Sequence, residues 1–76
     1  MKSVVRVIDG SSLINKKISE IESEYGIKVL AKFNPYSSKL NSKPVTPEDI
    51  VYPDLCLEIE GNYDSMRKFS LATVDF

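Results

Sequence analysis

Few residues of this 76-residue chain are of the types that support catalysis. The chain contains no histidine, which removes the commonest general base and the commonest transition-metal ligand. Serine–histidine and cysteine–histidine nucleophilic pairs are therefore impossible within one chain. The glycines stand singly at positions 10, 26 and 61, so the sequence has no glycine-rich phosphate loop. We expect a protein that is not an enzyme.

The lone cysteine and a group of carboxylates are the next candidates for chemistry. Cys56 alternates with leucines, so it is predicted on the less buried face of a strand, as a packed or interface thiol. Asp54, Glu58 and Glu60 could in principle hold a divalent cation, because Glu58 and Glu60 share a strand face. Solvated carboxylates are the simpler interpretation, and we expect no metal.

Lysines offer a stronger signal for binding. Lys28 and Lys32 are predicted on one face of a strand, and Lys39 and Lys43 follow them closely in sequence. One interpretation is a solvated sheet face. The other is a positive rim for an anionic ligand, since lysine provides a point charge suited to phosphate.

Hydrophobic periodicity predicts the elements that position these residues. Residues 4–8 are β-branched and end at an Asp-Gly turn, which is typical of a strand. Apolar residues spaced four, three and four apart over 14–25 predict an amphipathic helix, with Asn15 as a candidate cap and Gly26 as its left-handed end. Residues 27–33 alternate with period two, which predicts a second strand.

The second half of the chain continues in the same way. A turn is expected over 34–39 and a weak strand over 39–42, after which three prolines interrupt regular structure over 43–54. Residues 55–60 alternate as a further strand, and Asn62 can cap a last helix with Met66 and Phe69 on its inner face. The predicted order is β-α-β-β-β-α, an α+β two-layer sandwich of one small mixed or antiparallel sheet and two helices.

Length and charge limit the function classes. We expect one domain spanning 1–76, near the lower size limit for a single core, so a homodimer is predicted; apolar residues on both strand faces, such as Leu30, support it. A net charge of -1 does not favour nucleic-acid binding. No apolar run approaches the roughly 20 residues that span a bilayer, and one cysteine suits a reducing compartment, so we expect a cytoplasmic protein.

Several short patterns occur together in a characteristic order. Ser11–Ile21 is a serine, an apolar pair and a helix with an apolar repeat. Within Tyr25–Ala31, a glycine precedes a largely apolar predicted strand. Further on, Pro44 is followed ten residues later by Asp54, and then by a predicted strand that ends at Gly61. Over about residues 4–70 the chain resembles the C-terminal domain of regulators of potassium conductance, the RCK_C or TrkA-C family. It departs from the family pattern at several positions: Asn15 and Pro53 stand for glycines, Lys32 for an aliphatic residue and Asn34 for arginine.

The resemblance implies a regulatory, ligand-sensing dimerisation module of a potassium or other cation transport system, acting with a membrane transporter or channel subunit in cis or in trans. It implies a small anionic ligand, for which cyclic di-AMP or another nucleotide is the candidate, and no other cofactor. The cleft implied by the family lies along the second strand and its following loop, where Lys28, Lys32, Asn34 and Pro44 are the candidate ligand-binding residues. The alternatives are a purely structural dimerisation domain without a small ligand and, less favoured, a small enzyme subunit.

Overall fold

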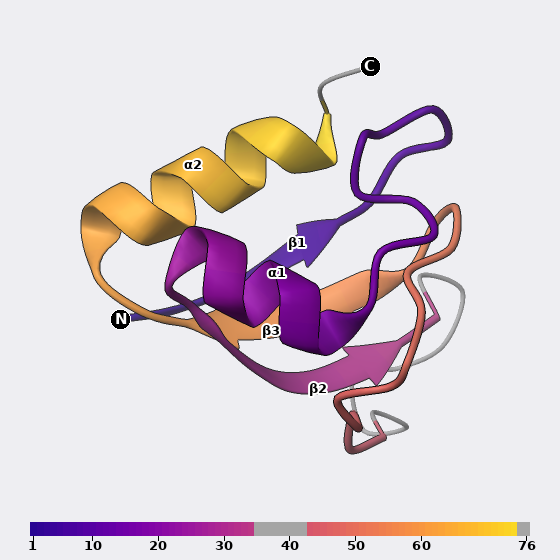
Figure 1. The fold of residues 1–76 in the computed structure, drawn as a ribbon. Helices are drawn as coiled ribbons and strands as arrows, with labels where there is room; N and C mark the ends of the chain where they lie inside the picture. The colour runs from indigo at the N-terminus through magenta and orange to yellow at the C-terminus, as the bar shows by residue number, and fades with distance from the viewer. Residues whose placement is uncertain (35–42, 75–76) are drawn as a thin grey trace.

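The computed structural model describes residues 1–34 and 43–74 (Figure 1). Over these ranges it is a small α+β fold of three antiparallel strands and two helices. The elements follow the order β1 (Lys2–Arg6), α1 (Ile18–Tyr25), β2 (Lys28–Phe33), β3 (Cys56–Glu60) and α2 (Tyr63–Thr73). The weak strand predicted at 39–42 and Lys39 lie outside the described residues.

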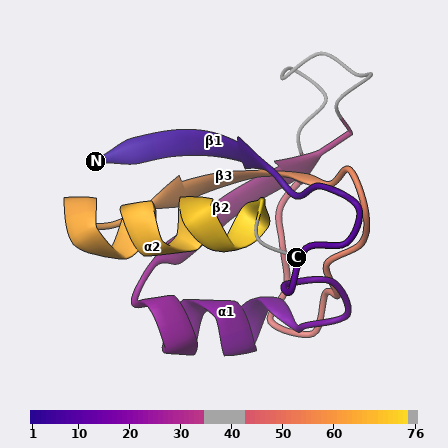
Figure 2. The same ribbon diagram turned by 90° about the horizontal axis from the view of Figure 1, so that it is seen from above.

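The central strand of the sheet is β3, which pairs antiparallel with β1 on one side and β2 on the other. Both helices lie against the same face of the sheet, with α2 over β1 and β3 and α1 toward β2 (Figures 1 and 2). Leu57 and Ile59 of β3 point into this layer and are fully buried. The core is completed by apolar residues from β2, from both helices and from the connections between elements: Val7, Leu13, Ile18, Ile21, Ile27, Val29, Val51, Leu55, Met66, Phe69 and Ala72.

A bulge in β2 changes which side chains share a face. Val29 pairs with Ile59, but the next paired residue is Ala31, opposite Glu58, so the register shifts by one at Leu30. Beyond the bulge Lys32 pairs with Leu57, whereas Lys28 pairs with Glu60. Successive residues of β3 point to opposite faces, so Lys28 and Lys32 lie on opposite faces of the sheet. The prediction that they share a face is wrong.

The start of α1 also differs from the sequence prediction. Periodicity placed residues 14–25 in one helix, but α1 begins at Ile18 and its N-cap is Lys17, which makes no side-chain capping bond. Asn15 has a φ of 71°, a left-handed conformation that ends the preceding turn and cannot continue into a helix. Asn15 therefore occupies the glycine-like conformation expected from the resemblance, and not a cap.

Other local predictions are confirmed. Gly26 ends α1 with a φ of 67°, and its N–H donates to the Glu22 carbonyl. Asn62 caps α2, because its side-chain oxygen accepts the Ser65 N–H at 2.8 Å. Met66 and Phe69 both face the core.

Candidate functional site

The end of β2 brings together most of the sequence-predicted ligand residues. Lys32 and Lys43 form an isolated antiparallel bridge, in which each backbone N–H donates to the other residue's carbonyl at 2.9 and 2.8 Å. Asn34 lies two residues beyond Lys32, and Pro44 follows Lys43, and both are exposed. Two lysines, an amide side chain and a proline thus meet at one corner of the molecule. We call this set, Lys32, Asn34, Lys43 and Pro44, the β2-end cluster.

Lys28 is not part of this cluster. It begins β2, four residues before Lys32, or about 13 Å away at ~3.3 Å per residue. It lies opposite Glu60, which on its other side faces Lys2, and the Lys2 Nζ is 3.9 Å from the Glu60 carboxylate. Lys28 therefore belongs to a cross-strand row of alternating charge on the sheet face away from the helices.

Within the cluster, Lys32 is held by a specific partner. Its Nζ lies 3.2 Å from Asp49 Oδ2, and both side chains are about three-quarters shielded from solvent. The same Asp49 oxygen accepts the Thr46 N–H at 2.9 Å. The Thr46 N–H first, and the Lys32 ammonium second, lower the pKa of the Asp49 carboxyl below its ordinary value. The positive charge of Lys32 is thus balanced by a local carboxylate.

The segment that carries Asp49 also completes the N-terminus of α1. The carbonyls of Asp49 and Pro47 accept the N–H groups of Ile18 and Ser19 at 2.9 and 3.1 Å. These are the first two N–H groups of the helix, which have no partner within it. Segment 43–50 therefore replaces the missing side-chain cap, and it links the β2-end cluster to α1 through backbone hydrogen bonds.

The carboxylates considered for a cation do not converge. Asp54 pairs with Arg6 at 2.8 Å, and Glu60 lies beside Lys2. Among the residues that the structure describes, no group of three potential ligands is close enough to hold a metal ion. The geometry favours the solvated, paired interpretation of these side chains.

Cys56 lies on the sheet face opposite the helices, as predicted, but it is buried there. Its neighbours across the strands are Arg6 and Phe33, and 6% of its surface remains accessible. Burial raises the pKa of the Cys56 thiol, and the positive charge of Arg6 offsets this in part. The thiol is therefore protonated at neutral pH, as in a packed cysteine.

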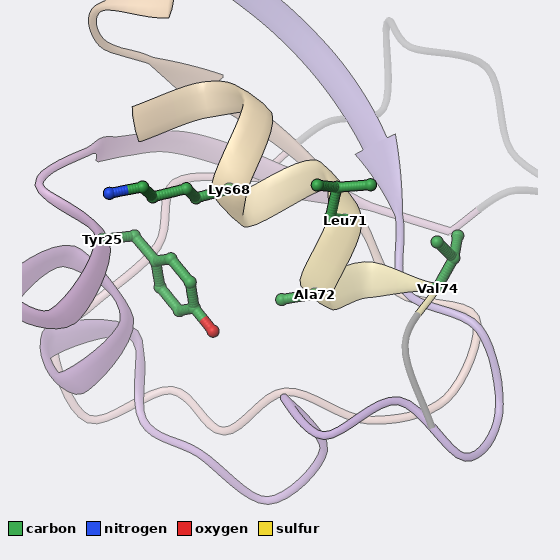
Figure 3. A pocket seen from close by; sticks show the side chains of 5 residues that line it. All are labelled: Tyr25, Lys68, Leu71, Ala72 and Val74. Atoms are coloured by element: carbon green, nitrogen blue, oxygen red, sulfur yellow. The ribbon is translucent and has the colours of Figure 1, made fainter. Parts of the chain in front are cut away.

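A hollow that was not predicted from the sequence lies on the helical side of the molecule. It has a volume of about 490 Å³, and it is lined by the last residue of α1 and by the second half of α2 (Figure 3): Tyr25, Lys68, Leu71, Ala72 and Val74. The Tyr25 ring is fixed against Phe69 in an edge-to-face contact, with centroids 5.4 Å apart. Leu71 and Val74 are more than half exposed. Their spacing along α2 outside its buried stripe is the signal that could have revealed this surface.

Comparison with protein-family models and with curated proteins finds no match to this chain. Neither helix in the described part of the chain has the length and apolar composition needed to cross a bilayer. The fold and the two surfaces described above are therefore the observations on which a functional proposal rests.

Proposed function

We propose that this chain is a regulatory, ligand-sensing dimerisation module of a potassium or other cation transport system, as its resemblance to the TrkA-C family implies. It acts without enzymatic activity of its own and without nucleic acid, on the cytoplasmic side of a transporter or channel subunit, in cis or in trans. Three antiparallel strands and two helices, in the order β-α-β-β-α over the described residues, support this proposal at the level of an α+β fold.

The observation that carries this proposal is the link between the β2-end cluster and α1. A ligand that contacts Lys32 or Lys43 also contacts or displaces the segment whose carbonyls cap α1. Binding can therefore change the stability of the N-terminus of α1, which lies in the helical layer. Such a link is what a sensor requires, because binding must change the stability of an element away from the ligand. The left-handed Asn15 and Gly26, at positions where the resemblance places conformationally permissive residues, support the same family.

The ligand class that fits the cluster is a small anion with two separated negative charges. Lys32 and Lys43 are cross-strand neighbours, and Asn34 offers an amide that can bond a base edge or a phosphate oxygen. Two copies related by a twofold axis would present four lysines, which suits a symmetric ligand such as cyclic di-AMP. Lys28 is separated from this group, so we assign it no role in ligand binding.

Titration calorimetry with cyclic di-AMP tests the ligand. We expect a Kd below about 100 μM, a free energy of roughly -5.5 kcal/mol, for the wild-type chain. Lys43→Ala should weaken binding by at least about fivefold, whereas Lys2→Ala on β1 should leave it unchanged. Lack of heat with the wild-type protein would remove the sensing role for this nucleotide and leave the alternative, a purely structural dimerisation domain.

A further inference from the structure

The two helices carry opposite charge on the same side of the molecule. Helix α1 contains three glutamates and no lysine or arginine. Glu24 pairs with Lys16 at 2.9 Å, whereas the exposed Glu20 forms no salt bridge within the described residues. The outward face of α1 is therefore acidic, with one carboxylate available to a partner.

The outward face of α2 is partly apolar and carries Arg67 and Lys68 beside one carboxylate, Asp64, so it has a small excess of positive charge. Arg67 and Lys68 are exposed, and neither forms a salt bridge with a carboxylate in the part of the chain that the structure describes. A second hollow of about 350 Å³ lies beside the first and shares Lys68 and Leu71 with it. Both hollows are open to solvent and shallow, so they suit a protein surface better than a small molecule, which a pocket normally encloses.

The two helices also differ in height. Figure 2 shows α1 standing farther from β1 and β3 than α2 does, so the two helices lie at different levels on this side of the molecule. Beside α1, the hollow over α2 forms a recess. The recess is the hollow between Tyr25 and Val74, whose floor is the nearly buried Ala72. One side of the molecule thus carries the acidic face of α1 next to a partly apolar recess lined by Lys68.

We infer that two copies of this chain associate through their helical sides, with α1 of each copy seated in the recess over α2 of the other. This inference rests on the proposed dimerisation and names its surface. Under a twofold axis the acidic face of α1 and the adjacent recess with Lys68 match each other twice, since both copies present both features. Glu20 of one copy then faces Lys68 of the other, and Leu71 and Val74 lose their exposure.

Other surfaces are less suited to self-association. On the open sheet face two pairs of opposite charges already lie together within the chain, Lys2 with Glu60 and Arg6 with Asp54. At the β1 edge, antiparallel pairing of two copies centred on Val4 would place Lys2 of one opposite Arg6 of the other, and like charges directly opposite are destabilising. The helical side has complementary charges that are left for a second copy.

Sedimentation equilibrium of the whole chain and its variants tests the inference. We expect Lys68→Glu and Glu20→Lys each to raise the dimer Kd by at least about tenfold, because like charges are then juxtaposed at both contacts. The double variant should return the Kd to within about threefold of wild type, because the same pairs reform with reversed sign. Glu20, Lys68 and the control position Lys2 are all exposed, so circular dichroism should show unchanged helix content in every variant.

Lys2→Glu is the matched control on the opposite side, and its dimer Kd should equal that of wild type. Equal weakening by Lys2→Glu, or a dimer that Lys68→Glu and Glu20→Lys both leave intact, would overturn the helical interface while dimerisation itself stands. A wild-type chain that stays monomeric up to about 200 μM, a free energy weaker than roughly -5 kcal/mol, would instead reject the proposed dimerisation.

Discussion

Lys32 Nζ and Asp49 Oδ2 lie 3.2 Å apart and join β2 to the segment that caps α1. The two residues are 17 positions apart in sequence, and their pairing connects an edge strand, a proline-bounded segment and a helix terminus. Asp49 makes three of the contacts in this connection: its side chain accepts from Lys32 and from the Thr46 N–H, and its backbone carbonyl accepts from the Ile18 N–H.

Asp49→Asn should lower the urea midpoint at neutral pH and lose this effect in acid. The folded-state pKa of Asp49 is depressed, so its stabilisation is present above the unfolded pKa of about 3.9 and disappears as the pH falls through the folded value. Urea denaturation of both proteins at pH 7 and at pH 2.5 measures the difference. Glu48→Gln serves as the control, because Glu48 is largely exposed and should change little at either pH. A midpoint difference that persists at pH 2.5 would contradict the assignment.

Glu22→Ala should destabilise the fold by about 1 kcal/mol or more. The Glu22 Oε2 accepts the N–H of Val29 at 2.8 Å, at the residue where the β2 bulge begins. Val29 is buried, so removing the carboxylate leaves its N–H without this acceptor. Glu22→Gln keeps an acceptor oxygen and should cost less than Glu22→Ala. Equal losses for the two variants would show that the hydrogen bond contributes nothing specific.

Gly26→Val should cost at least about 1 kcal/mol, because a β-branched residue is strained at a φ of 67°. The added Cβ would also lie 3.4 Å from the Ser65 Oγ, an ordinary contact, so the backbone conformation and not the space sets the cost. Gly26→Asn should be milder, since asparagine adopts left-handed conformations more readily. Thermal denaturation of the two variants gives the ranking, and a Val variant as stable as the Asn variant would refute it.

Asn15→Gly should be nearly neutral, within a few tenths of a kcal/mol, and Asn15→Val should cost about 1–2 kcal/mol. Asn15 has a φ of 71°, and its N–H donates to the Val51 carbonyl at 2.9 Å, so the conformation is held by a backbone contact that any residue can make. Chemical denaturation curves of the three proteins provide the comparison. A costly Asn15→Gly would mean that the asparagine side chain has a role beyond its backbone conformation.

Cys56 in the folded protein should react with iodoacetamide at least about 100-fold more slowly than in urea at the same pH, because reaction requires local opening. Burial limits access to the thiol, and its raised pKa lowers the thiolate fraction near neutral pH. Mass spectrometry of timed reactions measures both rates. Fast labelling without denaturant would show that the face carrying Cys56 is open in solution.

Local sequence determined the elements and several of their ends. Period-two alternation over 55–60, the apolar stripe at Ile18 and Ile21, the capping Asn62 and the left-handed Gly26 all correspond to the structure. These features depend on backbone conformation and side-chain spacing within a few residues, so they can be deduced from sequence. The grouping of Pro44 and Asn34 with Lys32 was expected from the resemblance to the TrkA-C family and not from local spacing.

Tertiary structure alone decided which charges meet. The bulge at Leu30 moved Lys32 to the face opposite Lys28, and strict alternation could not reveal it, because a bulge is defined by the register against a partner strand about 25 residues away. The pairing of Lys32 with Asp49 and the capping of α1 by Pro47 and Asp49 likewise join segments that are distant in sequence. The hollow over α2 is lined by Tyr25 of α1 and by Lys68, Leu71 and Ala72 of α2, so it forms only when the two helices pack together.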